Sequence, residues 1–461
     1  MKWSFALEKT WQLLKPVGSK TQPYDLTLDE IDKMETTNLI KETPVKQRML
    51  SNTLIIFMVA MVFANIAAEM YMTMLPLYLR YLGADVMQIG VFFTVSQIIP
   101  LVLQVLGGWV SDTIGRLKSV ALGSVIGLGA FISPIFVPTW QWLYLSEGLN
   151  AVTRSLIGPS FGALVAEETS EEHRARVYGI TDTIYTIVTV IGPPLAGWLA
   201  DTYGFRIMLT VAAGIYTCAT IIRLILANVA GKRRSGPARE KLSLKALKVN
   251  FKTIFGLFIA GGVLTWLLLT DGVRDIAFSL SFRLMPVYLE DIAGLNLQQI
   301  GWLTSFFGMA MMLTTIPAGW FADKFSERIA IALGFFIQFI ALLTLMNVVT
   351  FMGFAIAWFL FGIGVGLLSP AYQSLLSKVL PERLLGTGFG LIHASLGIFS
   401  LPAPAIGSFI WKRINPQAPF YITAILTLIT VIPAWLKFKL NVRDLERAAQ
   451  ANGHQERSED G

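Results

Sequence analysis

Long apolar stretches separated by short polar turns run through the chain from residue 53 to residue 437. Each stretch holds few Lys, Arg, Asp or Glu side chains, and each has the roughly 20 residues that a helix needs to cross ~30 Å of hydrocarbon. The pattern predicts twelve membrane-spanning helices, at residues 53–80, 87–110, 118–138, 140–165, 176–200, 206–228, 255–289, 298–321, 329–350, 352–377, 386–411 and 417–437.

The polar turn after the second stretch recurs after the eighth. Gly108 to Asp112 has the pattern Gly-Trp-x-x-Asp, and Gly319 to Asp323 repeats it at a shift of 211 positions. The same shift carries Gln88-Ile89-Gly90 onto Gln299-Ile300-Gly301, and Pro193 onto Pro404. Because one register holds from residue 88 to residue 193, we interpret the chain as two copies of a six-helix unit. The register also places the start of the overlong seventh crossing near Gly262.

Composition agrees with this pattern. Hydrophobic residues make up 54% of the 461 residues, charged residues make up 15%, and the mean hydropathy is +0.60. These values indicate an all-α polytopic membrane protein rather than several soluble domains. The sequence contains no metal-ligand cluster, nucleophile elbow or phosphate-cradling loop, so we expect no enzyme activity, no cofactor and no metal site. The single Cys218 excludes an internal disulfide, and we expect it to be a small core residue.

Basic residues gather in alternate loops, most densely between residues 232 and 248. Because Lys and Arg in short loops resist translocation, both termini are expected in the cytoplasm, with the chain in a plasma or inner membrane. The net charge of +7 then reflects topology and anionic lipid rather than nucleic acid. The expected divisions are a cytoplasmic tail at 1–50, a six-helix bundle at 51–229, a basic linker at 230–252, a second bundle at 253–438 and a tail at 439–461.

With two six-helix halves, a basic central loop and the repeated turn, residues 50–438 resemble the major facilitator superfamily of secondary transporters. The residues that match the turn motif of that family are Gly108, Asp112, Gly115 and Arg116, with a weaker second copy at Gly319, Asp323, Lys324 and Arg328. The resemblance implies a monomer whose halves rock about a central site, and a turn that latches the cytoplasmic side in the outward-facing state. Independently of this resemblance, glycine at position 108 is expected to let two helices approach closely, and glycine at position 115 permits a tight reversal of the chain.

The fifth stretch is similar to the antiporter motif of the same superfamily. Gly179, Gly192, Pro193 and Gly197 match that motif, whereas Val188 and Ala196 do not. A Gly-Pro pair bends a membrane helix, so Gly192 and Pro193 are expected to form a bend. The partial match favours export over uptake.

Charged residues inside the stretches are the site candidates, because a charge at mid-membrane costs ~2.5–3.5 kcal/mol and needs a partner, a cavity or a function. Glu69 lies near the middle of the first stretch, on the same helical face as Asn65. Desolvation favours a protonated carboxylate, so Glu69 could load and release a proton near neutral pH. A structural ion pair is the alternative.

Two more candidate pairs involve the fourth, fifth and eleventh stretches. Glu147 and Arg154 lie two turns apart, with Asn150 between them, and form either a substrate contact or an ion pair. Asp182 and His393 occupy matching positions of the two repeats, so they could face one cavity. Histidine titrates near neutrality, which suits proton coupling, although a packing histidine is the alternative.

The seventh stretch carries Asp271, Arg274 and Asp275 on one helical face. This cluster could bind a cation or a proton, form a gate, or be a structural pair.

We expect secondary active transport of small organic solutes by alternating access, with protons as coupling ion, membrane lipids as surroundings and efflux as the direction. The alternatives are proton-coupled uptake of a sugar or organic acid, and a membrane sensor or scaffold that transports nothing.

Overall fold

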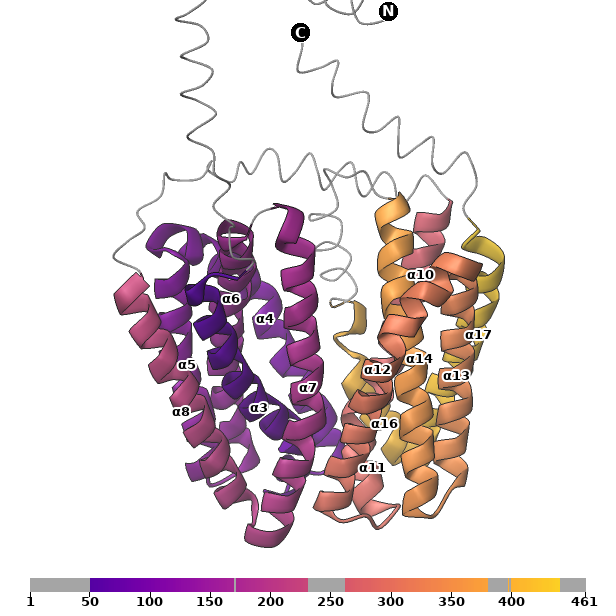
Figure 1. Ribbon diagram of the computed structural model, residues 1–461. Helices are drawn as coiled ribbons and strands as arrows, with labels where there is room; N and C mark the ends of the chain where they lie inside the picture. Colours follow the sequence, from indigo (N-terminus) through magenta and orange to yellow (C-terminus); the bar gives the residue numbers. More distant parts are fainter. Residues whose placement is uncertain (1–49, 170, 231–261, 380–396, 398, 440–461) are drawn as a thin grey trace, which may run out of the picture. The chain divides into compact units, whose positions relative to one another are not determined.

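The computed structural model describes residues 50–169, 171–230, 262–379, 397 and 399–439, all within one unit, Met49–Gly461. The helices of the first half are α3 Asn52–Tyr81, α4 Val86–Ile114, α5 Arg116–Phe136, α6 Leu143–Glu168, α7 Glu171–Tyr203 and α8 Phe205–Ala230. Those of the second half are α10 Val263–Ser281, α11 Met285–Asp291, α12 Leu297–Phe325, α13 Glu327–Asn347, α14 Phe351–Val379, α16 Ala403–Arg413 and α17 Ala418–Lys437 (Figure 1). The expected tails and basic linker lie outside the described residues, apart from their edges.

The all-α membrane fold is confirmed, and the described residues contain no strand. Eight of the described helices are long and apolar enough to cross a membrane, and α4 adds a shorter apolar segment, Val86–Pro100. The helices α6 and α10 are not among these eight. They carry Glu147 with Arg154 and Asp271 with Arg274, the charges that make them candidates for function.

The duplication is visible in the turns that join equivalent helices. Gly83 and Gly294, which are related by the repeat register, both have positive φ, +88° and +68°. The next helix of each repeat begins with a capping box, made by Asp85 with Gln88 in α4 and by Asn296 with Gln299 in α12. Such a box satisfies backbone N–H groups that have no partner within the helix. The two halves therefore share local chemistry as well as register.

The seventh crossing is broken where the first is continuous. Helix α10 begins directly after Gly262 and ends at Ser281, and a 3-10 turn over Phe282–Leu284 joins it to α11. Pro286 lies in the first turn of α11, where the missing N–H of proline is tolerated. In the first repeat, Pro76 lies inside an unbroken α3. The break places Arg283 at the end of a helix, and its side chain lines a cavity.

The two halves meet through reciprocal contacts of glycine with proline. A Cβ atom at Gly301 would lie 2.5 Å from the Pro193 carbonyl oxygen, and one at Gly90 would lie 2.5 Å from that of Pro404. Helix α12 therefore packs against α7, and α4 against α16, at backbone contact (Figure 1). The Ser305 hydroxyl adds a hydrogen bond to the Val190 carbonyl in the first of these interfaces. Small residues at helix interfaces in membranes allow such close approach.

Two ion pairs join the halves at the same end, which we call the closed end. Arg80 Nη2 lies 3.1 Å from Asp291 Oδ2, and Lys412 Nζ lies 3.2 Å from Asp85 Oδ2. A hydrogen bond from the Gln88 backbone N–H, with a further contribution from Lys412, lowers the pKa of the Asp85 carboxyl below its usual range. The Asp85 carboxylate is therefore ionised at neutral pH, where its pair with Lys412 can form.

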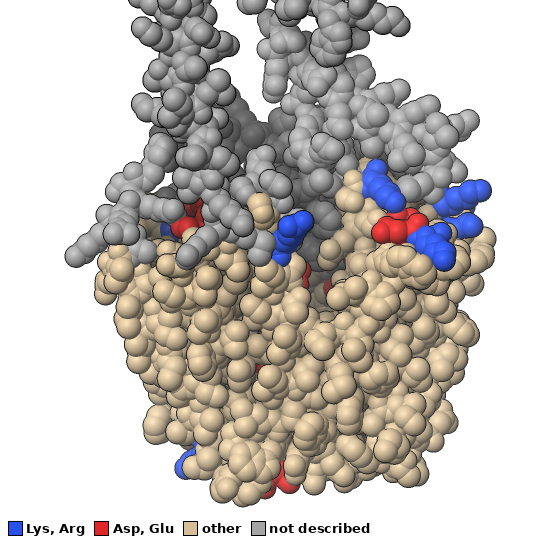
Figure 2. Space-filling model, viewed as in Figure 1, with Lys and Arg blue, Asp and Glu red and all other residues tan. Residues whose placement is uncertain are grey.

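The opposite end carries the turns after α4 and α12, and there the described surface is hollowed between the halves (Figure 2). Positive-inside reasoning assigns that end to the cytoplasm.

One expectation about the helix core is wrong: Cys218 is exposed on α8. A cysteine on the outside of a membrane helix faces lipid, so hydrophobicity alone did not require it to be inside.

Gly301→Ala should destabilise the protein, because the new methyl group overlaps the Pro193 carbonyl. Overpacking of this kind typically costs about 1–3 kcal/mol. The measurement is the midpoint of thermal unfolding of the purified protein. Gly214→Ala is the matched control, since a Cβ at Gly214 in α8 meets nothing within 4 Å. Equal midpoints for the two variants would contradict the proposed packing.

Candidate substrate site

A cavity of about 590 Å³ lies between the two halves. Its size falls within the ~300–1,000 Å³ typical of small-molecule sites. Side chains from α3, α5, α6, α7 and α8 line it on one side, and side chains from the broken seventh crossing, α12 and α14 line it on the other. A molecule bound there would touch both halves at once.

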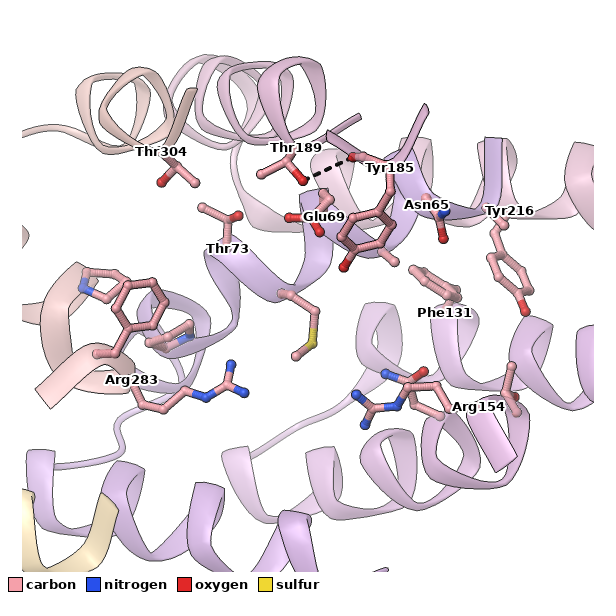
Figure 3. Close-up of a pocket in the computed structure, with 18 of the residues that line it drawn as sticks. Asn65, Glu69, Thr73, Phe131, Arg154, Tyr185, Thr189, Tyr216, Arg283 and Thr304 are labelled. Carbon is pink, nitrogen blue, oxygen red and sulfur yellow. Dashed lines mark hydrogen bonds between the residues drawn. The ribbon is translucent and has the colours of Figure 1, made fainter. Parts of the chain in front are cut away.

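Glu69 is the acidic residue among those that line this cavity. Its carboxylate lies beside the Tyr185 hydroxyl, and Thr73 and Thr189 are its neighbours on α3 and α7 (Figure 3). Asn65, one turn earlier on α3, also lines the cavity, as their spacing predicted. The structure therefore brings Asn65 and Glu69 together in the candidate site.

Gly192 fixes the position of Glu69. A Cβ atom at Gly192 would lie only 2.7 Å from the Glu69 Cβ, so α7 touches α3 at this point. Helix α7 continues without interruption through Pro193 to Tyr203. Gly192 packs closely against Glu69, and Pro193 against Gly301; their role as a bend stays a prediction.

Arg154 and Glu147 form the ion pair that was one of the two expected alternatives. Arg154 Nη2 lies 3.8 Å from Glu147 Oε2; the Glu147 side chain is 5% exposed and the Arg154 side chain 50% exposed. Arg154 also lines the cavity, with Asn150, whereas Glu147 lies behind the wall. The pair thus combines both alternatives, because the same arginine can meet a substrate.

Sequence reasoning missed two arginines of the cavity wall, Arg223 in α8 and Arg283 in the break after α10. Arg283 and Arg154 point into the same space from different walls, and their charges act on one another and on Glu147 (Figure 3). Arg223 donates a hydrogen bond to Ser124 (3.2 Å) and lies over the Phe57 ring. Both arginines lie inside predicted stretches, so a complete inventory of charges in the stretches would have found them.

Other candidates lie away from this cavity. Asp271 and Arg274 form an ion pair of 2.5 Å within the second half, and Arg274 lies over the ring of Tyr372. Neither these two residues nor Asp275 line the cavity. A separate role for this cluster as a gate or cation site stays a prediction.

Asp182 has an exposed side chain and does not line the cavity. His393, its equivalent in the second repeat, lies outside the described residues. Their approach to a common space therefore stays a prediction. Spacings of three and seven residues place Asp182 on the same side of α7 as Tyr185 and Thr189, which line the cavity; Asp182 lies farther along the helix, towards the end opposite the closed end.

The repeated turns join helices at the end opposite the closed end, which the predicted orientation places in the cytoplasm. Gly115 has φ +93° and ψ +151°, a conformation that favours glycine, which confirms the tight reversal. Its equivalent, Ser326, has φ +155°. The side chain of Asp112 and the surroundings of Gly108 lie outside the part of the chain that the structure describes, so their latch role stays a prediction.

Each repeat has an ion pair at the same place, but the positions of the acidic and the basic residue are exchanged between the repeats. Arg116 Nε lies 3.2 Å from Glu167 Oε1, and the repeat register carries this pair onto Glu327 and Lys378, which are also bonded. Both pairs tie the start of one helix to the end of the next. The duplication has thus kept the bond while exchanging its charges.

The second turn contacts its own half in this structure. Lys324 lies over the Trp320 ring and Arg328 over the Trp435 ring. Asp323 is exposed, and a Cβ at Gly319 would meet nothing within 4 Å. Lys324 and Arg328 thus contact aromatic rings of their own half, and the latch role of this turn stays a prediction.

Two helical halves around a central cavity with charged residues on its wall have the architecture of a polytopic membrane transporter. A family model described as the Major Facilitator Superfamily matches residues 57–295 and 269–458. The chain belongs to this superfamily, which confirms the resemblance and the expectation of a transporter rather than an enzyme.

Curated relatives are similar along most of their length. The multi-drug resistance efflux pump PmrA homolog of Lactococcus lactis is 23% identical over 391 residues, covering 83% of this chain and 93% of that protein. The multidrug resistance protein MdtG of Serratia proteamaculans is 24% identical over 379 residues, covering 80% and 89%. A crystal structure of the peptide transporter POT in complex with sulfate matches with a TM-score of 0.65 at 14% identity, over 84% of this chain and 95% of that one, and so shows the fold alone.

The exchanged ion pair gives a direct test of the repeat. Arg116→Glu and Glu167→Lys should each lower the midpoint of thermal unfolding, because each places like charges together. The two changes combined should restore it, since they reproduce the polarity found in the second repeat. An exposed pair of this kind is worth about 0.2–1 kcal/mol. If the midpoint of the double variant fell by the sum of the decreases seen in the two single variants, the pairing would be contradicted.

Proposed function

We propose that the chain exports small amphipathic organic molecules in exchange for protons. The observation that carries this proposal is the Glu69 carboxylate on the wall of a largely apolar cavity between the halves. The similarity to relatives named as multidrug efflux proteins supports export. Secondary transport needs a group whose ionisation changes what the site binds, and Glu69 is suited to that role.

The proposed cycle uses Glu69 as the proton carrier. When the cavity opens to the cytoplasm, Glu69 releases its proton and a substrate binds. When the halves rock, the closed end separates, the substrate leaves, and a proton from outside binds Glu69. A carboxylate partly removed from water takes up a proton more readily than one in water, which suits this exchange near neutral pH.

Several finer assignments belong to this proposal. Both termini face the cytoplasm of a plasma or inner membrane, so the closed end faces outward. The protein acts as a monomer, with bundles at 51–229 and 253–438. The turn residues Asp112 and Arg116, with Asp323, Lys324 and Arg328 in the second copy, latch the cytoplasmic side once it closes.

Glu69→Gln should abolish proton-driven accumulation of lipophilic dyes in inside-out vesicles, because the amide cannot carry the proton. The measurement compares dye uptake with and without a pH gradient. Uptake by the variant should fall to the level of vesicles without the protein, while purified variant and wild type unfold at similar temperatures.

Asp201→Asn is the matched control, since it removes an exposed acidic group from α7 that does not line the cavity. It should retain gradient-driven uptake. Full gradient-driven uptake by Glu69→Gln would remove this residue from coupling. A wild type that accumulates no dye would favour uptake of a sugar or organic acid instead.

A further inference from the structure

The charges of the cavity are separated by sign. Glu69 lies on the wall made by α3 and α7, whereas Arg154 projects from α6 and Arg283 from the break after α10 (Figure 3). With Arg223, the wall carries three arginines and one acid. Glu147 behind the wall offsets part of this excess. A ligand with a single charge would leave one of these walls without an oppositely charged group.

The two guanidinium groups also act unfavourably on each other. Arg283 is close enough to Arg154 for their charges to interact, and both share the single neighbouring carboxylate of Glu147. A carboxylate placed between them would relieve the repulsion and could accept hydrogen bonds from both, the arrangement in which arginine binds oxyanions most strongly.

Aromatic groups supply the apolar remainder of the wall. Phe131, Phe282, Phe307 and Trp358 line the same cavity as the charges. The buried polar atoms of lining residues that have no hydrogen-bond partner among the described residues include Asn65 Nδ2 and Trp358 Nε1. Both are donors, so a ligand with acceptor groups along its body would suit them.

We propose that the substrates are amphipathic zwitterions, with a cationic amine at Glu69, an acidic group at Arg154 and Arg283, and an aromatic body between them. This inference rests on the proposed export function and deepens it. It also gives the exchange a physical cause. The ammonium group and the proton compete for the Glu69 carboxylate, so binding of substrate expels the proton, and binding of a proton releases the substrate.

The test uses four compounds that share a biphenyl body: an aminomethyl-biphenyl-carboxylic acid, its carboxamide, the acid with methyl in place of aminomethyl, and the neutral methyl carboxamide. Binding to the full-length protein in lipid nanodiscs is measured by calorimetry without any gradient. Wild type should bind the zwitterion about tenfold or more tightly than either singly charged analogue, as one charge-assisted hydrogen bond can support.

The variants assign each end of the ligand. Glu69→Gln should weaken the binding of the two compounds that carry an amine and leave the binding of the acid without an amine unchanged. Arg283→Gln should weaken the binding of the two compounds that carry a carboxylate and leave that of the amine without an acid unchanged. Arg283→Lys should restore part of the lost affinity. Because Arg283 is only partly exposed, Arg154→Gln, which alters a half-exposed side chain, provides a second test of the acidic end. Arg206→Gln, outside the cavity, should change nothing.

The proposal is overturned if wild type binds the cation or the neutral compound as tightly as the zwitterion, if it binds none of the four, or if neither Glu69→Gln nor the arginine variants change the ranking. Failure of export is distinguishable, because the dye assay depends on a pH gradient and this one does not. Zwitterion binding without gradient-driven transport would leave the site intact and refute only the exchange.

Discussion

The structure depends on two places where the backbones of the halves touch. Gly301 lies against Pro193, and Gly90 against Pro404, at distances that exclude even a methyl group. Because the repeat register relates these contacts to one another, each half presents the same glycine and proline to its partner. Such a contact holds the halves together at one end while leaving the other end free to open.

The charged cavity is the second consequence of this arrangement. A charge inside a membrane costs several kcal/mol unless it has a partner or water. Here Glu69, Arg154, Arg223 and Arg283 gather on the wall of one cavity, where an ion, water or substrate can reach them. The contact of Gly192 with Glu69 ties the acid to α7, the helix that also contacts α12. Motion at the closed end is thereby coupled to the position of the carboxylate.

Much of this could be predicted from sequence. Hydropathy predicted most helix positions, and the repeat register related pairs of turns that the structure shows to share positive φ and capping boxes. The cavity was harder, because hydropathy finds a membrane charge but not the direction of its side chain. Asp182 and Asp271 looked equivalent to Glu69, yet neither lines the cavity: Asp271 pairs with Arg274 within the second half, and Asp182 lies farther along α7 than the lining residue Tyr185. Arg283 is directed by a break in its helix, which no periodicity indicates.

The central claim is that the state of Glu69 controls the closed end: it stays shut while Glu69 is ionised and empty, and it can separate once Glu69 has bound either a substrate or a proton. The direct measurement is the distance between spin labels at the ends of α3 and α11, on Tyr81→Cys and Ile292→Cys in a Cys218→Ser background, by pulsed electron resonance at neutral pH. We expect one short distance when Glu69 is present and an added longer population in Glu69→Gln, the mimic of the protonated state, which reports the effect of Glu69 without any change of pH. An identical short distance in both proteins would contradict the account.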